Sequence, residues 1–478
     1  MDKSAASRTI DPILQLPCHS QVTSISFVSQ RNSFRSSAHP DRLERLHSNS
    51  VDNAKEKADG PENHSQSSDD NDDNDNIDDD DDDDDDIIGF RSSNIRLGGP
   101  SSVSSYEYSR RLLADRFLAS CHINGEALLW DLKNQRPVAT ISPPRGGSGV
   151  CVRRTDDPSL IMFQTRDPKG TVSLHPIERC HTEAPNCSPF VSSTPSVHTQ
   201  SSSNHYYETY SRTFCRAAPC LGNHHLLALP NVDHSTVTIV DNRTDATVAK
   251  HKIENHGMVT SLALTLSDSH SDHCNGRPIL ACGMESGTIF FFDSTYGSTK
   301  PFHKSSFSIG KDPVLTLDAI PSSSVKSADG KKYSASLLVA AGMAGDAQDV
   351  SELSVDEAGR AVIFKSFCTD KDNDDSQWHF KQRARLSTCR VDRESYGGKP
   401  GVSICRFRPQ GGRLLAVGSW DRRIRLFERS KGNMMAVLKG GTGSIVDLDW
   451  APDSASSGLL ASVDKDDKLI RLWQCFAN

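Results

Sequence analysis

VSICRFRPQGGRLLAVGSWDRRIRLFERSKGNMMAVLKG (Val402–Gly440) and IVDLDWAPDSASSGLLASVDKDDKLIRLWQC (Ile445–Cys475) are two adjacent stretches that decide the fold. Each contains three short runs in which apolar and polar residues alternate, separated by Gly, Asp and Ser. This pattern is typical of half-buried strands joined by tight turns. Two successive copies of a unit of about forty residues, built from such strands, indicate neighbouring blades of a β-propeller.

A fixed spacing between turn-forming and aromatic residues relates these copies to the rest of the chain. A short polar residue lies six positions before an aromatic one in four places: Asn124 before Trp130, Ser286 before Phe292, Asp421 before Phe427 and Asp467 before Trp473. Short polar side chains suit a hairpin because they accept hydrogen bonds from nearby backbone amides. We therefore expect structural rather than catalytic roles here, and also at the flanking Ser419, Asp131 and Asp293.

The segments FRPQGGRLLAVGSWDRRIRLF (407–427) and LLASVDKDDKLIRLW (459–473) resemble WD repeats. The same strand rhythm, followed along the chain, predicts an all-β, seven-bladed WD-repeat β-propeller formed by residues 11–27 and 106–478, with six blades as the alternative count. The last blade ends after its third strand, at Cys475. We expect Asp11–Leu16 to pair beside Leu469–Cys475, because this strand would complete the blade and leave no long edge open.

Residues 28–105 are expected to form a disordered Asp-rich insertion within blade one, because they contain too few apolar side chains to offset the entropy of ordering. Fourteen aspartates lie between Asp69 and Asp86; the whole chain carries a formal net charge of −8, and without these aspartates the remainder would carry +6. Two roles remain open: a solvated spacer, or a segment that engages a basic partner or the basic face of the chain itself. A Ser/Pro/His-rich insertion is expected at residues 178–211.

Metal, cofactor and membrane signals are weak. The pieces CHTEAPNC (Cys180–Cys187) and HSDHC (His270–Cys274) contain zinc-ligand types but no short Cys-x-x-Cys hook, so no metal or cofactor is expected. The sequence shows no charged and apolar leader and no apolar run of membrane-span length. We expect a protein of the nucleus or cytoplasm that is neither secreted nor embedded in a membrane.

Motifs of the main enzyme classes are missing from the sequence. It has no G-x-S-x-G elbow, no phosphate loop with its lysine and no H-E-x-x-H pair, and Gly440–Ser444 reads as a turn between blades. Carboxylates inside the repeats are expected at turns. The sequence therefore predicts a protein that is not an enzyme and has no catalytic residues.

The layout of the chain resembles one branch of the WD-repeat class, the G-protein-β-subunit-like protein 1 and ASTRA-associated protein 1 family. The residues that carry this resemblance are DPILQLPCHSQVTSISF (11–27), LASCHINGEALLWDLKNQRPVATI (118–141), RPILACGMESGTIFFFD (277–293) and the two C-terminal copies quoted above. The acidic insertion departs from the family pattern, and so do the insertions after blades two and four.

This resemblance implies a non-catalytic scaffold for protein–protein interactions, in a co-chaperone assembly that matures phosphatidylinositol-3-kinase-related kinases. The alternative is a chromatin-associated adaptor, linked to the ASTRA complex or to histones, that uses the acidic insertion or a basic face. We expect a monomer within a larger complex and no membrane partner. Trp420, Arg422 and Arg423 are the candidate partner contacts, because an indole exposed at a turn is a typical interface anchor.

The alternative for Trp420 is that its ring packs across the hairpin onto blade seven. Nucleic-acid binding is not expected, because the arginines of residues 421–425 and 381–385 should face solvent beside neighbouring acids. Real nucleic-acid binding would weaken steeply with salt.

Overall fold

The computed structural model describes residues 8–28, 116–141, 147–155, 157, 160–166, 169–178, 190–191, 206–211, 213–220, 225–267, 277–294, 303–306, 312–321, 335–343, 361–369, 377–386, 401–409, 413–452 and 458–475. All of them belong to one compact unit, formed by Met1–Gln30 and Val103–Asn478. All the regular secondary structure in these ranges is β-strand. None of the described residues forms a helix that is long and apolar enough to cross a membrane.

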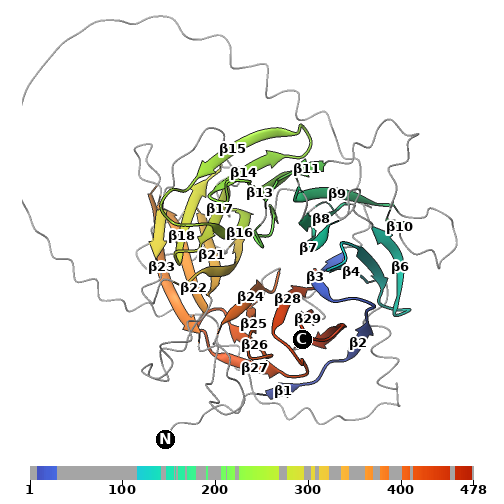
Figure 1. Ribbon diagram of the computed structural model, residues 1–478. Helices are drawn as coiled ribbons and strands as arrows, with labels where there is room; N and C mark the ends of the chain where they lie inside the picture. The colour runs from blue at the N-terminus through green and yellow to red at the C-terminus, as the bar shows by residue number, and fades with distance from the viewer. Residues whose placement is uncertain are drawn as a thin grey trace, which may run out of the picture. The chain divides into compact units, whose positions relative to one another are not determined.

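The strands form seven sheets, and Figure 1 shows them arranged as a ring. Blade one contains β3 (Val22–Val28), β4 (Phe117–His122), β5 (Ala127–Asp131) and β6 (Arg136–Ile141). Blade two contains β7 (Ser148–Arg154), β8 (Leu160–Arg166), β9 (Thr171–Glu178), β10 (Phe190–Val191) and β11 (Tyr206–Glu208). Blade three contains β12 (Ala218–Pro219), β13 (Leu226–Pro230), β14 (Thr236–Asp241) and β15 (Ala246–Lys252).

The remaining four blades follow in chain order. Blade four contains β16 (Val259–Leu266), β17 (Pro278–Met284), β18 (Thr288–Asp293) and β19 (His303–Ser306). Blade five contains β20 (Val314–Pro321), β21 (Ala335–Met343), β22 (Ala361–Thr369) and β23 (Gln377–Leu386). Blade six contains β24 (Val402–Phe407), β25 (Leu414–Ser419), β26 (Ile424–Glu428) and β27 (Met434–Leu438), and blade seven contains β28 (Ile445–Trp450), β29 (Leu459–Asp464) and β30 (Leu469–Gln474).

The ring is closed at its centre by the first strand of each blade. Neighbouring first strands contact one another all the way round, in the order β3, β7, β12, β16, β20, β24, β28 and back to β3. The predicted seven-bladed β-propeller is therefore confirmed.

The chain's beginning completes the last blade, as predicted. β2 (Leu14–Pro17) pairs antiparallel with β30, with Leu14 opposite Leu472, and Leu16 is buried. A second strand was not predicted: β1 (Arg8–Ile10) pairs parallel with β27 of blade six. The N-terminal segment thus joins both of the last two blades, and Figure 1 shows β1 and β2 in blue beside these red and orange strands.

The first strand of most blades contains a β-bulge, and the next blade approaches closely there. In six of the seven first strands, the pairing with the second strand of the same blade shifts register. The residue that follows the shift is Ser24, Cys151, Ser261, Thr316, Ile404 or Asp447. Opposite the bulge, blades four, five and six carry a glycine. A Cβ on Gly283 would lie 2.7 Å from Val314 Cγ1 and one on Gly418 would lie 2.6 Å from Ile445 Cγ2, so the missing side chain is what admits the next blade.

The aromatic residues of the repeat pack between blades, as predicted. Trp130 is buried among side chains of blades one and seven, and its Nε1 donates a hydrogen bond to Ser120 Oγ at 2.8 Å. Trp473 is buried among side chains of blades six and seven and donates in the same way to Ser462 Oγ at 2.8 Å. Each indole therefore fills the space between two sheets and also ties two strands of its own blade together.

The predicted insertions lie mostly outside the described residues. Of residues 28–105 only Val28 is described, at the end of β3; the chain is next described from Arg116, just before β4, which pairs with β3 in blade one. The predicted disorder of this insertion lies outside the described residues. Within the segment 178–211, β10 and β11 pair with opposite ends of β9, so this segment supplies the outer edge of blade two.

Candidate protein-interaction face and central channel

The turns between second and third strands meet the links into the first strands at one end of the ring. A backbone amide in the turn donates to a carbonyl in the link in four blades: Ile123 to Gln21 (3.0 Å), Glu285 to Met258 (2.8 Å), Trp420 to Gly401 (2.9 Å) and Lys465 to Ser444 (2.8 Å). This repeated bond fixes the turns and links to one another. We call this end of the ring the turn face.

Exposed apolar side chains gather on the turn face. Among the described residues, seven large hydrophobic side chains are exposed, and five belong to these turns and links: Ile123, Tyr210, Phe214, Val232 and Met258. The remaining two, Met434 and Met435, lie on the outer strand β27. Tyr210 belongs to the turn face because its amide donates to Gly170 O in the turn of blade two, at 3.3 Å.

The three predicted contact residues also lie on the turn face, in the turn of blade six. Trp420 is half-buried, and its ring lies against its own blade, since a Cβ on Gly401 would be 2.6 Å from two ring atoms. It is therefore not a fully exposed indole, and the alternative, packing onto blade seven, stays a prediction. Arg422 is exposed with a φ of 66°, and Arg423 is half-buried. Their contact with a partner stays a prediction.

The aspartates at the predicted turn positions pair with buried arginines. Asp421 Oδ2 lies 2.6 Å from Arg425 Nη2, and Asp467 forms the equivalent ion pair with Arg471 in blade seven. The expectation that the arginines of residues 421–425 face solvent is wrong for Arg425. Its Nη1 and Nη2 donate to the two carboxylate oxygens of Asp421, and this pairing allows the guanidinium to be buried.

The other predicted repeat positions take structural roles. Asn124 Oδ1 accepts from Glu126 N (3.3 Å), Ser286 Oγ donates to Thr288 Oγ1 (3.1 Å), Asp131 Oδ1 accepts from Lys133 N (2.9 Å), Asp293 lies 3.5 Å from Arg277 Nη1, and Ser419, Phe292 and Phe427 are buried.

A second cluster, in the central channel, was missed by the sequence reading. Asp447 of β28 is fully buried and binds two arginines from other blades. Its Oδ2 lies 2.9 Å from Arg153 Nη1, and its Oδ1 lies 2.8 Å from Arg216 Nη1. It also accepts hydrogen bonds from Ser24 Oγ (2.6 Å) and Ile25 N (3.0 Å) of blade one. One carboxylate therefore joins blades seven, one, two and three.

Burial and charge oppose each other at this carboxylate. Burial alone would raise the pKa of Asp447, but the positive charges of Arg153 and Arg216 outweigh burial and hold the pKa well below its ordinary value. Asp447 is therefore ionised at neutral pH. Arg153 remains charged, because Asp447 more than offsets the cost of burying its guanidinium and raises its pKa.

The same hydrogen bond recurs in the channel at three junctions between blades. A side-chain oxygen on the first strand of one blade accepts a hydrogen bond from a backbone amide on the first strand of the next blade. The acceptors come in pairs two residues apart: Ser24 and Ser26 accept from Val152 N and Arg154 N, Thr316 and Asp318 from Cys405 N and Phe407 N, and Asp447 and Asp449 from Ile25 N and Phe27 N. These polar side chains therefore join neighbouring blades by hydrogen bonds at the axis.

These positions correct the expectation that carboxylates inside the repeats lie at turns. Asp318, Asp447 and Asp449 lie within first strands, whose inner side faces the channel. The signal was present in the sequence as charged residues alternating with buried ones in IVDLDW, LTLDAI and SICRFR. An innermost strand has no outer solvent to face, so alternation there places charges in the channel rather than on the surface.

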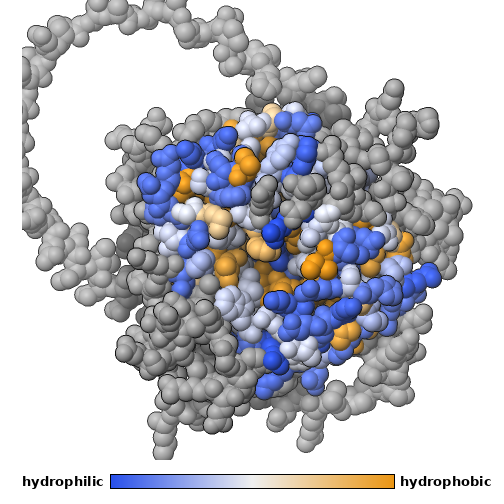
Figure 2. Space-filling model, in the orientation of Figure 1, coloured by the Kyte–Doolittle hydropathy of each residue, from blue (hydrophilic) through white to orange (hydrophobic). Residues whose placement is uncertain are grey.

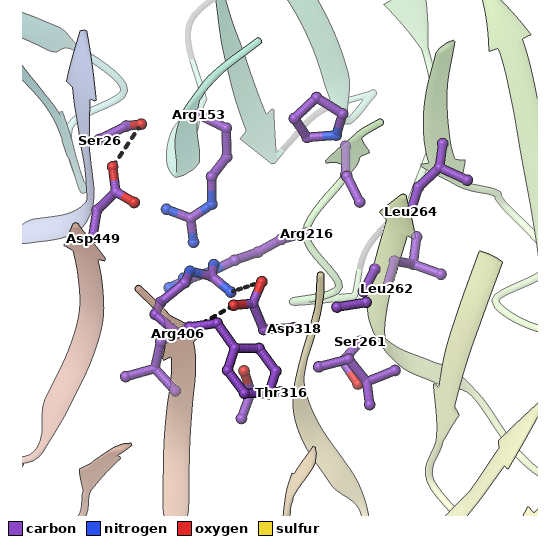
Figure 3. A pocket seen from close by; sticks show the side chains of 18 of the residues that line it. Ser26, Arg153, Arg216, Ser261, Leu262, Leu264, Thr316, Asp318, Arg406 and Asp449 are labelled. Atoms are coloured by element: carbon purple, nitrogen blue, oxygen red, sulfur yellow. Dashed lines mark hydrogen bonds and ion pairs between the residues drawn. The ribbon is translucent and has the colours of Figure 1, made fainter. Parts of the chain in front are cut away.

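A cavity of about 320 Å³ occupies the channel beside this cluster. Figure 3 shows the guanidinium groups of Arg153, Arg216 and Arg406 on one side and Leu262 and Leu264 on the other. Phe214, in the link into β12 on the turn face, also lines the cavity and is 77% exposed, and the cavity extends along the first strands as far as Pro409. Figure 2 shows hydrophobic side chains near the centre of the ring, with hydrophilic residues farther out.

The described residues contain no metal-binding cluster of three or more His, Cys, Asp or Glu side chains. The two candidate zinc pieces, 180–187 and 270–274, lie outside the described residues. Eight cysteines have described side chains, and all eight are buried. Burial raises the pKa of the Cys18 and Cys475 thiols to about 12, so they behave as apolar core groups.

No family model matches this chain. The chain folds as a seven-bladed β-propeller. It is similar to the β-propeller domain of Myceliophteria thermophila Cps50 (Swd1), at 14% identity and a TM-score of 0.47, over 77% of this chain and 95% of that one. It is also similar to Chaetomium thermophilum Raptor, at 14% identity and a TM-score of 0.45, over 77% of this chain but only 27% of Raptor.

Proposed function

We propose that this protein is a non-catalytic scaffold that binds a partner protein on its turn face. The observation that carries the proposal is the bias of exposed apolar side chains: five of the seven among the described residues lie on this face. Exposed apolar side chains gathered on one face mark interaction sites more often than scattered ones do. The polar bonds between blades leave the strands rigid, so the turns can be held in one arrangement for a partner.

The finer proposal concerns the kind of partner. We infer from the sequence resemblance that the partner belongs to a co-chaperone assembly for the maturation of phosphatidylinositol-3-kinase-related kinases. A chromatin-associated adaptor role is the second candidate, favoured by the fourteen aspartates between Asp69 and Asp86, whose charge complements basic histone-like segments. Both roles place the protein in the nucleus or cytoplasm.

Affinity purification of the tagged full chain from its own cells, followed by mass spectrometry, tests these roles. Recovery of kinase-maturation co-chaperones supports the first role, and recovery of histones or chromatin-complex subunits supports the second. A reproducible absence of any stable partner would refute the scaffold proposal.

A matched pair of variants tests the face. Met258 on the turn face and Met434 on β27 are each 39% exposed. We expect Met258→Lys to reduce partner recovery at least tenfold and Met434→Lys to leave it within twofold, with both variants melting close to the wild type. Equal recovery in the two variants would show that the partner binds elsewhere.

A further inference from the structure

The central cavity carries a surplus of positive charge. Four arginines line it, namely Arg153, Arg154, Arg216 and Arg406. Asp318 and Asp449 also line it, and the buried Asp447 lies against Arg153 and Arg216. Four positive charges therefore face three negative ones, which leaves one positive charge without a counter-ion in this cluster.

Arg406 is where that surplus is exposed to the cavity. Its Nη1 donates to Cys405 O at 3.2 Å and lies 3.7 Å from Asp318 Oδ1, which is longer than a hydrogen bond. Among the described residues, none accepts a hydrogen bond from its Nε or Nη2. Burial, followed by repulsion from Arg153, lowers the pKa of Arg406, although a guanidinium still stays protonated.

The carboxylate of Asp318 does not accept a hydrogen bond from the guanidinium of Arg406. Its Oδ2 accepts the backbone amide of Phe407 at 2.6 Å, which holds the carboxylate against β24 rather than in the fork of the guanidinium. Burial raises the pKa of Asp318, and the charge of Arg406 offsets only part of that effect. The Arg406 side chain is 16% exposed, so its spare donors face the cavity, and an anionic acceptor placed there would gain charge-assisted hydrogen bonds.

The wall opposite the guanidinium groups carries leucines. They are Leu262 and Leu264 of β16 and Leu317 of β20, and they lie beside the polar Ser261 and Thr316 of the same strands. A ligand that fits has an anionic end for the arginines and an aliphatic part for the leucines. The volume of about 320 Å³ lies at the lower end of ligand pockets, of roughly 300 to 1,000 Å³.

We propose that this cavity binds a carboxylate of the partner protein, from an aspartate or glutamate side chain next to an aliphatic residue, with Arg406 as the donor. The proposal rests on the scaffold function above and names the chemistry that the partner inserts beside the turn face. A carboxylate carries one negative charge and matches the surplus of one. A phosphate group carries about two at neutral pH and would exceed it.

The first experiment uses a small probe with this chemistry. We would titrate the full chain at neutral pH with 4-methylpentanoate and with its uncharged counterpart 4-methylpentanamide, and detect binding by saturation-transfer NMR. We expect the carboxylate to bind at least tenfold more tightly than the amide and to weaken with added salt. Equal affinity for the two probes, or no binding of either, would overturn the proposal, and neither result requires a variant that folds.

Two arginine variants then locate the site. Arg406→Met should lose at least tenfold in affinity for 4-methylpentanoate, whereas Arg383→Met, at an exposed arginine on the outer strand β23, should lose less than twofold. Equal affinity in the Arg406 variant would place carboxylate binding elsewhere and overturn the proposal.

The partner assay separates this inference from the scaffold function. Partner recovery that depends on Met258 but not on Arg406, with no probe binding, refutes the carboxylate site and leaves the scaffold. Probe binding that depends on Arg406, without any recovered partner, refutes the scaffold and with it the assignment of the carboxylate to a partner protein.

Discussion

Arg153 of blade two and Asp447 of blade seven form a two-point ion pair across blade one. Arg153 Nη1 lies 2.9 Å from Asp447 Oδ2, and Nη2 lies 3.0 Å from Oδ1. Both groups are largely removed from water, with 11% and 0% of their side chains exposed. The pair spans two blades that are not neighbours, so it fixes the ring rather than one sheet.

Asp447→Asn should therefore destabilise the protein strongly. The variant leaves Arg153 and Arg216 without their charge partner, and breaking a buried pair costs about 3 to 5 kcal/mol. Urea unfolding at pH 7 measures this loss as a fall in the midpoint. A loss below about 1 kcal/mol would show that the arginines find other partners.

Asp318→Asn is the matched control. Asp318 also accepts an amide from the next blade, but its pKa is raised by burial, so its charge costs stability at neutral pH. We expect this variant to be neutral or slightly more stable than the wild type at pH 7. A loss as large as that of Asp447→Asn would contradict the proposed difference between the two carboxylates.

The pH dependence of Asp447 has a definite sign. Its pKa in the folded protein lies below the ordinary value of 3.8, so the unfolded chain takes up the proton first as the pH falls. The contribution of the Asp447 charge to the free energy of unfolding is complete at neutral pH and is lost as the pH falls below about 4. The difference in unfolding free energy between wild type and Asp447→Asn should shrink between pH 5 and pH 3, and a constant difference would refute this assignment.

Stepwise deletion tests the closure of the ring. Removing residues 1–7 should leave the melting temperature unchanged, removing 1–11 should lower it because β1 is lost, and removing 1–17 should lower it further because β2 and the buried Leu16 are also lost. Removing residues 31–102 should have a small effect, because loop-closure cost changes slowly with length. Equal tolerance of the 1–17 and 31–102 deletions would refute the closure.

Gly418→Ala tests the close approach between blades six and seven. The new Cβ would lie 2.6 Å from Ile445 Cγ2 and 2.7 Å from Ile404 Cγ2, and overpacking of this kind costs about 1 to 3 kcal/mol. In a double-mutant cycle, Ile445→Ala removes one of the two clashing methyl groups, so the cost of Gly418→Ala should fall in that background. If the stability losses of the two substitutions simply add, contact with Ile445 is not what makes Gly418→Ala costly.

Trp130→Ala should cost about 3 to 5 kcal/mol, because it empties the space between blades one and seven. Trp130→Phe should cost less, since blades four and six already hold Phe292 and Phe427 at the equivalent position. It loses only the hydrogen bond to Ser120 and part of the ring. Thermal denaturation ranks the two variants, and a phenylalanine variant as damaged as the alanine one would indicate that the hydrogen bond dominates.

Much of the fold follows from local pattern. Strand periodicity, turn residues and the missing fourth strand of the last blade predict the ring and its closure by Asp11–Leu16, which overlaps the observed strand β2 (Leu14–Pro17), because these signals depend on neighbours in the sequence. The strand β12 is shorter than its sequence suggests: TFCRAAPC (213–220) predicts a strand of several residues, but only Ala218 and Pro219 pair. The proline itself cannot donate to a ladder, which limits the strand.

The channel cluster could not be predicted in the same way. Asp447 and Arg153 are 294 residues apart, and no local pattern selects one partner over another at that separation. The burial of Arg425 depends on its fork to Asp421, and the parallel β1 depends on an edge that exists only after blade six has formed. Such features arise from three-dimensional neighbours, and the sequence alone gives only the charged residues themselves.

The pairing of β2 with β30 orders events during synthesis. The ribosome makes Leu14 long before Leu469, and at about 5 to 20 residues per second the interval is roughly 20 to 90 seconds. During that time β2 lacks the edge of β30 with which it pairs. The ring can therefore close only after the residues of β30, near the other end of the fold, have been made.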